Sequence, residues 1–318
     1  MDAWLGIDTS CYTTSICLVD EDFHILTDKR KILTVKPGSR GLSQSNMVYQ
    51  HTRNLPALFE EAGDVWGHCT IRGIAVTNAP RRRDDSYMPA FLAGLGYARS
   101  LAAVLQVPLY QISHQENHLF AVLRSTSTMA TAPFYGIHLS GGTTDLLYAV
   151  PDAAGLAITR IGGTSDISAG QFVDRVGVAL GLSFPAGKHL DALAKDGNPA
   201  IQGDRVFHKE GEISFSGVET KAQRLIAKGD ELAPSDRALW TLKTVWNGLV
   251  ILLEQARQQG MSHLVVAGGV MSNSYLRAQI TAYGTQHHLR IDTGEAAYSS
   301  DNASGAAFWA AWKERNQS

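Results

Sequence analysis

Two stretches of the sequence decide the fold: Gly6-Ile7-Asp8-Thr9-Ser10 and Gly136-Ile137-His138-Leu139-Ser140-Gly141-Gly142-Thr143-Thr144. Each begins as a strand, turns through small residues and continues into a second apolar run, residues 15–19 in one copy and 146–150 in the other. The copies are about 130 residues apart, whereas a solenoid repeats every ~20 to 50 residues. The duplication therefore predicts two lobes of related topology, with a ligand in the cleft to which both turns point.

Short strand-like runs alternate with longer helical patterns through the rest of the chain, which indicates an α/β protein. The predicted strands are 4–7, 15–19, 23–27, 74–77, 109–112, 135–139, 146–150, 157–161, 263–267 and 289–291. The predicted helices are 45–62, 89–105, 113–124, 168–180, 237–259, 274–283 and 302–315.

Composition narrows the class of protein further. The 318 residues are 44% hydrophobic and 18% charged, enough for about two domains of ~150 residues and inconsistent with a disordered or fibrous chain. The 28 Lys and Arg against 30 Asp and Glu give a net charge of −2, so the chain has no overall positive field to hold a nucleic acid. An RNA partner would need a helper protein or a local patch. Three adjacent arginines, Arg81-Arg82-Arg83, stand in a charged loop and could contact phosphates, although a solvated loop is the default interpretation.

The sequence also indicates a cellular compartment. Cys11, Cys17 and Cys69 form no Cys-x-x-Cys pair, so we expect neither a disulfide framework nor a zinc knuckle. Residues 1–4 include no basic region before an apolar stretch, so we expect no secretory leader, and no apolar run approaches the roughly 20 residues that span a bilayer. We expect a soluble cytoplasmic protein with no membrane partner.

The segment Ser113-His114-Gln115-Glu116-Asn117-His118 has capping-box spacing, which predicts a helix that begins at Ser113. His114 and His118 then lie at i and i+4 on one face and could hold a metal ion as neutral imidazoles. The alternative is two unrelated histidines, one at the cap and one in the core. Asp301, at the start of the last predicted helix, is the candidate third ligand, and such a mixed set suits zinc, iron or manganese.

Two diglycine turns follow predicted strands. Ser140-Gly141-Gly142-Thr143-Thr144 could bring backbone N–H groups and hydroxyls close to a phosphate, or it is only a tight hairpin turn. Ala267-Gly268-Gly269 leads into a helix that Ser272 or Asn273 could cap, and it could support a base or ribose or serve packing alone. Neither turn matches the Rossmann or P-loop pattern.

Other segments carry weaker signals. Asp174 and Asp191 lie in helical stretches, where each is either a surface charge or an acceptor for ribose hydroxyls. Ser214-Phe215-Ser216-Gly217 lacks the nucleophile elbow Gly-x-Ser-x-Gly, so we expect no hydrolase triad. We also expect no metalloprotease, because Glu116 is two residues after His114 and not one, as His-Glu-x-x-His requires.

Taken in order, these segments resemble the TsaD family of ASKHA-fold proteins, formerly named Gcp or M22 glycoproteases, nearly from end to end. The matches to the family's motifs are Leu5–Cys11, His51 with Leu55-Pro56, His114 with His118, Leu139–Gly142, Ser214–Gly217, Ala267–Val270 with Asn273, and Ser299–Ala303. Asp174, Gly187 and Asp191 fall on positions that hold the nucleotide in such proteins.

The resemblance implies an ASKHA fold with two duplicated lobes around a nucleotide cleft. The first lobe would span residues 1–112, completed by the C-terminal helix 302–318, and the second, residues 113–301, would hold both the metal and the nucleotide. One divalent ion, Fe or Zn with Mn and Mg as alternatives, would bind His114, His118 and Asp301. An ATP- or AMP-type nucleotide would contact residues shared by the two glycine turns and the neighbouring helices: His138, Leu139, Ser140, Gly141, Gly142, Asp174, Gly187, Asp191, Gly268, Gly269 and Asn273.

The activity implied is transfer of threonylcarbamoyl from threonylcarbamoyl-adenylate to the exocyclic amine of adenosine in tRNA, with no catalytic residue apart from the metal ligands. A TsaB-like ASKHA paralogue and a TsaE-like ATPase are the implied partners. Two other functions stay open: a carbamoyl-adenylate transferase acting on a small molecule, and a silent nucleotide-binding paralogue that acts as a scaffold or regulator.

The chain departs from the family at several polar positions, which indicates a divergent paralogue. Tyr12 and Thr13 replace two carboxylates, Asn78–Arg83 replaces a Gly-Pro-Gly-Leu loop, Thr143 replaces a histidine, and Asp166–Gln171 replaces Asp-Asp-Ala-Ala-Gly-Glu. Ligand-holding positions are kept while substrate-facing ones differ.

Overall fold

The computed structural model describes residues 1–10, 12–35, 42–126, 131–229 and 231–316, so Cys11 lies outside the described residues. The chain divides into two compact units. Unit 1 comprises residues 1–132, 150–158 and 300–318, and unit 2 comprises residues 133–149 and 159–299.

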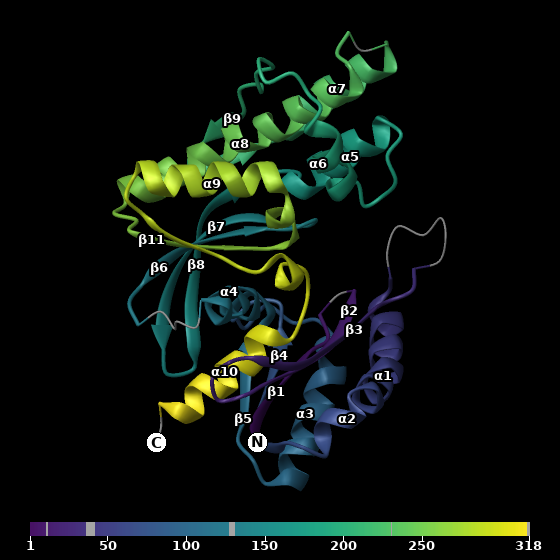
Figure 1. Ribbon diagram of the computed structural model, residues 1–318, viewed down its shortest axis with the longest axis vertical. Helices are drawn as coiled ribbons and strands as arrows, with labels where there is room; N and C mark the ends of the chain where they lie inside the picture. Colours follow the sequence, from purple (N-terminus) through teal and green to yellow (C-terminus); the bar gives the residue numbers. More distant parts are fainter. Residues whose placement is uncertain (11, 36–41, 127–130, 230, 317–318) are drawn as a thin grey trace. The chain divides into compact units, whose positions relative to one another are not determined.

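Unit 1 is built on a five-stranded sheet of order β3-β2-β1-β4-β5. Its strands are β1 (Asp2–Asp8), β2 (Thr13–Val19), β3 (Ile25–Ile32), β4 (Thr70–Ala79) and β5 (Leu109–Ser113). Its helices are α1 (Gln44–Glu61), α2 (Gly63–Trp66), α3 (Phe91–Leu105), α4 (His114–Ser125) and α10 (Ser304–Arg315). In Figure 1, α1 and α3 pack on the sheet, and α10 contacts β1, β2 and β4 as well as α4.

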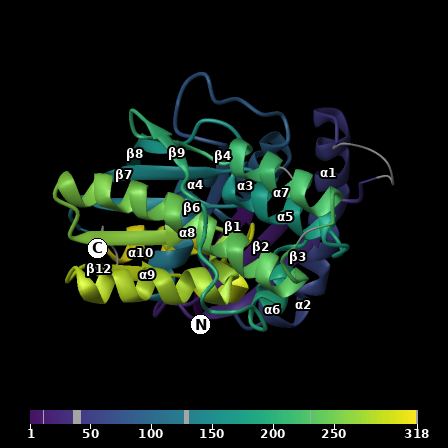
Figure 2. The same ribbon diagram turned by 90° about the horizontal axis from the view of Figure 1, so that it is seen from above.

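Unit 2 contains a seven-stranded sheet of order β12-β11-β6-β7-β8-β10-β9. Its strands are β6 (Phe134–Leu139), β7 (Thr144–Asp152), β8 (Gly155–Thr164), β9 (Phe207–Lys209), β10 (Glu212–Ser214), β11 (His263–Ala267) and β12 (Arg290–Thr293). Its helices are α5 (Ala169–Ala179), α6 (Gly187–Ala194), α7 (Ser216–Ala227), α8 (Pro234–Gln258) and α9 (Ser274–Gln286), with short 3₁₀ turns η1 (Gly269–Ser272) and η2 (Ala296–Tyr298). Helices α8 and α9 run side by side in Figures 1 and 2.

The duplication predicted from the two glycine-containing stretches is visible in the strand order. In unit 1 the first strand lies between its antiparallel partner β2 and the parallel strand β4, and β5 follows β4. In unit 2, β6 likewise lies between antiparallel β7 and parallel β11, and β12 follows β11. The same order of five strands therefore occurs twice.

The two units differ from the predicted lobes at their boundaries. Residues 113–132 and the β7–β8 hairpin tip, 150–158, group with unit 1 instead of the second lobe. A buried contact explains this, because Leu156 N donates to Glu116 Oε1 at 2.8 Å and so ties the tip to α4. The predicted metal ligands consequently belong to unit 1, and the predicted nucleotide-binding residues belong to unit 2.

All ten predicted strands and all seven predicted helices are present, with ends shifted by a few residues, and α6 corresponds to the helical stretch predicted around Asp191. The elements without a prediction are α2, α7, β9, β10 and the two 3₁₀ turns η1 and η2. Each unit has its own apolar core, which in unit 2 includes Phe172, Phe215 and Trp240 and in unit 1 includes Leu5, Ile7 and Val76. Among the described residues, no helix combines the length and the apolar character needed to cross a bilayer.

Candidate functional site

Three polar side chains meet at one edge of the unit 1 sheet. Strands β1, β4 and β5 are parallel neighbours, and Asp8, Thr77 and His114 lie where these strands end. The carboxyl ends of parallel strands share an edge, which is where ligands bind in open α/β sheets. An irregularity in the β4–β5 pairing between Thr77 and Ala79 lies at the same edge.

Helix α4 begins with the predicted capping box. Ser113 Oγ accepts from Glu116 N at 3.2 Å, and Glu116 Oε2 accepts from Ser113 N at 2.7 Å. The cap fixes the first turn, so His114 and His118 share a face with their ring centroids 4.4 Å apart.

Asp301 joins the two histidines. Its Oδ1 lies 3.6 Å from His114 Nε2 and 3.4 Å from His118 Nε2, and the two Nε2 atoms are 3.0 Å apart. Ligand atoms on one metal ion are spaced about 3.3–3.6 Å in tetrahedral geometry and about 3.0 Å between adjacent octahedral positions, for bonds of 2.0–2.2 Å. The three donors therefore have the spacing of a metal site, and neither geometry is selected over the other.

The charges of this cluster reinforce one another. Burial lowers the pKa of His114, but the carboxylates of Asp8 and Asp301, 3.3 and 3.6 Å away, outweigh this effect, so the pKa lies well above its ordinary value. Burial alone would raise the pKa of Asp301, but the two imidazoles hold it well below its ordinary value. Without a metal, the positive charge among the donors is the protonated ring of His114. A bound metal ion would supply positive charge in place of that proton.

Close packing of α10 sets the position of Asp301. The helix begins at Ser304, two residues later than the predicted start at residue 302, so Asp301 lies three residues before it. A Cβ atom on Gly305 would overlap Asn117 O and come within 2.7 Å of Ala121 N, so α10 can approach α4 only with glycine at this position. Asn117 closes the contact, since its Oδ1 accepts from Ala306 N at 2.8 Å.

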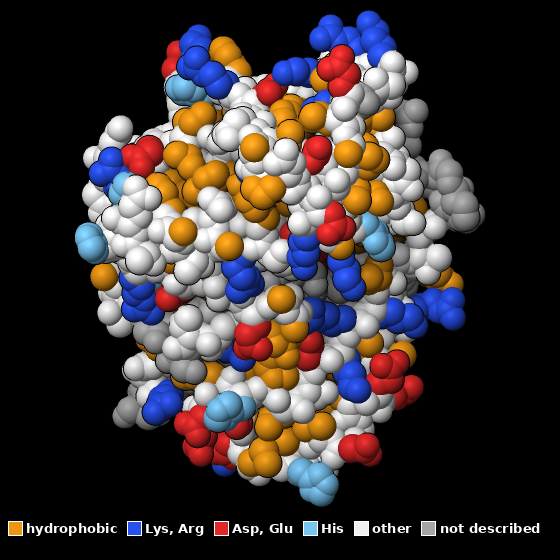
Figure 3. All heavy atoms as spheres, turned by 45° about the horizontal axis from the view of Figure 1, so that its top comes forward, with side chains coloured by type: hydrophobic (Ala, Val, Ile, Leu, Met, Phe, Trp, Pro, Cys, Tyr) orange, Lys and Arg blue, Asp and Glu red, His pale blue; other side chains and the backbone are white. Residues whose placement is uncertain are grey.

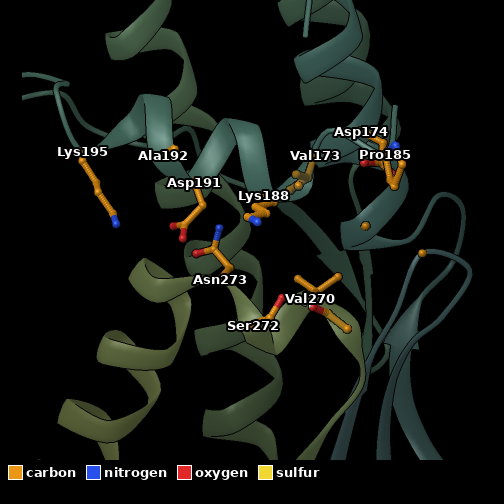
Figure 4. A pocket seen from close by; sticks show the side chains of 14 residues that line it. Val173, Asp174, Pro185, Lys188, Asp191, Ala192, Lys195, Val270, Ser272 and Asn273 are labelled. Atoms are coloured by element: carbon orange, nitrogen blue, oxygen red, sulfur yellow. Dashed lines mark hydrogen bonds between the residues drawn. The ribbon is translucent and has the colours of Figure 1, made fainter. Parts of the chain in front are cut away.

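Unit 2 contains a pocket of about 620 Å³, within the range that holds a nucleotide. Asp174, Lys188, Asp191 and Asn273 project toward it in Figure 4. Its lining is Gly141, Gly170, Val173, Asp174, Pro185, Gly187, Lys188, Asp191, Ala192, Lys195, Gly269, Val270, Ser272 and Asn273.

Both predicted ribose acceptors lie at this pocket, and each already has a backbone donor. Asp174 accepts from Ala186 N at 2.8 Å, and burial raises the pKa of Asp174 despite bonds from Ala186 and Gly187. Asp191 accepts from Ser274 N at 3.0 Å, at the start of α9, where Asn273 is the N-cap. Each carboxylate keeps lone pairs for a ligand.

The two glycine turns are neighbours because β6 and β11 pair in parallel. Gly268 has φ +100°, and a Cβ there would overlap Leu139 O. Only glycine therefore lets the turn after β11 come this close to the end of β6. In the other turn, Ser140 Oγ accepts from Gly142 N at 3.3 Å and Thr143 N at 3.0 Å, so these two N–H groups already have a partner inside the turn.

Of the predicted nucleotide-binding residues, Gly141, Asp174, Gly187, Asp191, Gly269 and Asn273 line the pocket. His138, Leu139, Ser140, Gly142 and Gly268 are not part of its lining. His138 and Leu139 are buried strand residues of β6, next to the turn.

Three residues at these sites were missed from the sequence. Asp8 was assigned no role from the sequence, and its signal is a carboxylate at the end of a predicted strand. Lys188 and Lys195 line the pocket from α6, as does Asp191 between them. Their spacing from Asp191, three residues before it and four after it, places all three on one face of the helical stretch predicted there, which is a signal the sequence carries.

The serine-containing segment 214–217 is bound by the carboxylate of Asp166. Asp166 accepts from the hydroxyls of Ser214 and Ser216 and from Phe215 N at 3.0 Å, at the start of α7. Burial alone would raise the pKa of Asp166, but these bonds hold it below its ordinary value. The described structure ties both serine hydroxyls to the Asp166 carboxylate.

The arginine cluster is largely engaged with acidic side chains. Arg82 NH2 lies 2.9 Å from Asp152 Oδ2, and Arg83 NH2 lies 2.8 Å from Asp85 Oδ2. On the face drawn in Figure 3, Lys and Arg side chains likewise stand among Asp and Glu side chains. The cluster therefore offers less positive charge to a nucleic acid than its sequence suggests.

Comparison with known proteins identifies the family. A profile described as TsaD, tRNA N6-adenosine threonylcarbamoyltransferase, matches residues 39–308. Proteins named tRNA N6-adenosine threonylcarbamoyltransferase from Sorangium cellulosum and Carboxydothermus hydrogenoformans are each 31% identical, over 96% and 94% of this chain and 89% and 88% of their own lengths.

Solved structures of low sequence identity share the fold. Full-length HypF in a phosphate- and nucleotide-bound form matches with a TM-score of 0.62 at 13% identity, covering 100% of this chain and 47% of HypF. A ROK family glucokinase from Streptomyces griseus matches with a TM-score of 0.53 at 12% identity, covering 97% of this chain and 99% of the glucokinase. The chain therefore has the ASKHA fold, and by its sequence it belongs to the TsaD family of acyltransferases.

Proposed function

We propose that this protein is a metal-dependent transferase that moves threonylcarbamoyl from threonylcarbamoyl-adenylate to the exocyclic amine of adenosine in tRNA. The observation that carries the proposal is the convergence of His114, His118 and Asp301, whose donor atoms all lie within 4.8 Å of one another. Membership of the TsaD family supports threonylcarbamoyl as the group transferred and adenosine in tRNA as the acceptor.

The three residues would hold one divalent ion, Fe or Zn with Mn and Mg as alternatives. Such an ion would supply a Lewis acid that polarises the carbamoyl carbonyl and orients the donor. Both imidazoles present Nε2, and Asp301 supplies the single negative charge of the set.

The pocket of unit 2 would hold the adenylate as an ATP- or AMP-type nucleotide. Asp174 and Asp191 offer acceptors for ribose hydroxyls, and Lys188 and Lys195 offer positive charge to a phosphate. Val173 and Val270 give the same pocket apolar walls suited to a base.

The reaction needs no protein nucleophile. The adenosine amine attacks the carbamoyl carbon, a C–N bond forms, the C–O bond to the phosphate breaks, and AMP leaves with the electron pair. The amine proton passes to solvent or to the leaving phosphate.

Because the chain carries a net charge of −2, tRNA binding would depend on other subunits. A TsaB-like ASKHA paralogue and a TsaE-like ATPase are the proposed partners, in the cytoplasm.

The test is transfer of threonylcarbamoyl to unmodified tRNA with the adenylate-forming enzyme and both partners present, followed by mass analysis of the digested nucleosides. We expect modified adenosine with the wild type and none above background with His114→Ala. Equal product from the two proteins would contradict the metal-dependent reaction.

The departures from the family define the other outcomes. Tyr12, whose side chain is 40% exposed, stands at a position where the family has a carboxylate, so a ligand there would meet a phenol instead of a negative charge. Metal and nucleotide binding by calorimetry without transfer to tRNA would favour a small-molecule acceptor or a regulatory paralogue. Binding of neither ligand would exclude a transferase.

A further inference from the structure

Asp8 is a buried carboxylate that faces the candidate metal ligands without belonging to them. Its side chain is fully buried, and its Oδ2 lies 3.3 Å from His114 Nδ1. The opposite nitrogen of the same ring, Nε2, faces Asp301 and His118. Asp8 therefore lies on the far side of the imidazole from the donor cluster.

The carboxylate is held in place by two hydroxyls. Ser10 Oγ donates to Asp8 Oδ2 at 2.7 Å, and Thr77 Oγ1 donates to Asp8 Oδ1. Ser10 and Thr77 are themselves fully buried, so neither donor exchanges easily with water. With both oxygens occupied, Asp8 has little freedom to turn away from His114.

This arrangement favours one ring nitrogen of His114 for the proton. Nδ1 is buried, makes no hydrogen bond within the described part of the chain, and has the Asp8 carboxylate 3.3 Å away as a neighbouring acceptor. A carboxylate beside Nδ1 accepts a hydrogen bond and keeps the proton there, which leaves the lone pair on Nε2. An amide in its place could donate to Nδ1 and stabilise the opposite tautomer, with the proton on Nε2. That tautomer cannot ligate a metal through Nε2.

We propose that Asp8 is a positioning residue, which orients His114 and fixes its tautomer so that Nε2 can bind a divalent metal ion. This role rests on the metal site of the proposed function and adds to it a residue from β1, a different element from those that supply the donors. Asp8 is not one of the three donors and would act through His114.

The experiment measures metal binding rather than transfer. Apo-protein is titrated with Zn²⁺ or Co²⁺ by calorimetry for the wild type, Asp8→Asn, His118→Ala and the control Asp28→Asn. Asp28 lies in the same sheet and pairs with Arg30 at 2.5 Å, but it is not part of the histidine cluster. The tautomer of His114 is read from its ring ¹⁵N shifts in the Zn²⁺-loaded wild type and, at an alkaline pH where the ring is neutral, in the apo wild type and the apo variants.

We expect Asp8→Asn to bind the metal about 10- to 100-fold more weakly, the usual cost of losing such a partner, and to shift the His114 proton toward Nε2. Asp28→Asn should bind as the wild type does, and His118→Ala should lose most of its binding. Unchanged affinity and an unchanged tautomer in a folded Asp8→Asn protein would overturn the role of Asp8 while the metal site stands.

Two further outcomes are decisive. Should Asp8→Asn not fold, the loaded wild type decides: a protonated Nδ1 on His114 supports the proposal, and a metal-bound Nδ1 overturns it. Should the wild type and His118→Ala bind metal equally, the donor set itself is wrong, and the role of Asp8 falls with it.

Discussion

Asp174 and Asp191 show how a carboxylate can serve the fold and a ligand together. Asp174 uses one oxygen to accept from Ala186 N, just before α6, and Asp191 accepts from Ser274 N at the start of α9. Both bonds hold the walls of the unit 2 pocket, while the carboxylates still line it. A substitution must therefore preserve shape to report on ligand binding alone.

For this reason Asp174→Asn is the informative change at the pocket. The amide oxygen can still accept from Ala186 N, but the charge that attracts ribose hydroxyls is lost. We expect AMP to bind about 10-fold more weakly, on the scale of a hydrogen bond to a charged group, when measured by calorimetry. Asp196→Asn, at an exposed residue outside the pocket lining, should leave AMP affinity unchanged. Equal losses in both variants would indicate a general effect of charge.

Asp166 predicts a pH dependence of stability. Its pKa in the folded protein is lowered by the hydroxyls and N–H groups at the start of α7, so its stabilising effect is complete above the ordinary Asp value. The effect is lost as the pH falls below about 4 and through the folded pKa. Urea unfolding should show Asp166→Asn less stable than the wild type at pH 7, with a smaller difference at pH 3. A difference that is constant with pH would rule out this carboxylate as the cause.

At the scale of elements, two glycines let helix α10 approach the sheet and α4. A Cβ on Gly6 would overlap Ala303 O, and one on Gly305 would overlap Asn117 O. These contacts set the chain that precedes α10, which contains Asp301, against the helix that carries both histidines. Helix packing and ligand geometry are thus coupled in unit 1.

Gly305→Ala should separate α10 from α4, because both overlapping atoms belong to the backbone and cannot rotate away. We expect a loss of about 1–3 kcal/mol in the free energy of unfolding, together with weaker binding of Zn²⁺. Gly96→Ala is the matched control: its Cβ would meet nothing within 4 Å on helix α3, so it should stabilise the protein by up to about 1 kcal/mol. Thermal unfolding and calorimetry measure both quantities, and a neutral Gly305→Ala would contradict the coupling.

At the scale of the whole molecule, charge is balanced and locally paired. The net charge is −2, and Arg82 and Arg83 of the basic cluster pair with Asp152 and Asp85. Little unpaired positive charge is therefore offered by this loop for phosphate neutralisation.

The isolated chain should bind tRNA weakly, with a Kd on the order of 10⁻⁵ M or above at physiological salt. Addition of the proposed partner subunits should tighten binding and steepen its salt dependence, because they would supply phosphate contacts. Fluorescence anisotropy between about 50 and 200 mM salt measures both effects. Submicromolar binding by the chain alone would show that it carries its own tRNA surface.

The sequence by itself determines the features of this protein that depend on interactions between residues close together in the chain. The cap at Ser113, the paired faces of His114 and His118, the cap at Asn273 and the duplicated strand-turn-strand each depend on neighbours a few residues away, and the structure contains them all. Short-range hydrogen bonds and side-chain periodicity act within one element, so they can be read along the chain.

Tertiary structure alone decided which of these elements meet. The parallel order of β1, β4 and β5 brings Asp8 to His114, and the packing allowed by Gly305 brings Asp301 to the histidines. The pairing of β6 with β11 makes the two glycine turns neighbours, and α6 adds lysines to the pocket. Such contacts join residues far apart in the sequence, and they are selected by burial and close packing of whole elements, which no local pattern encodes.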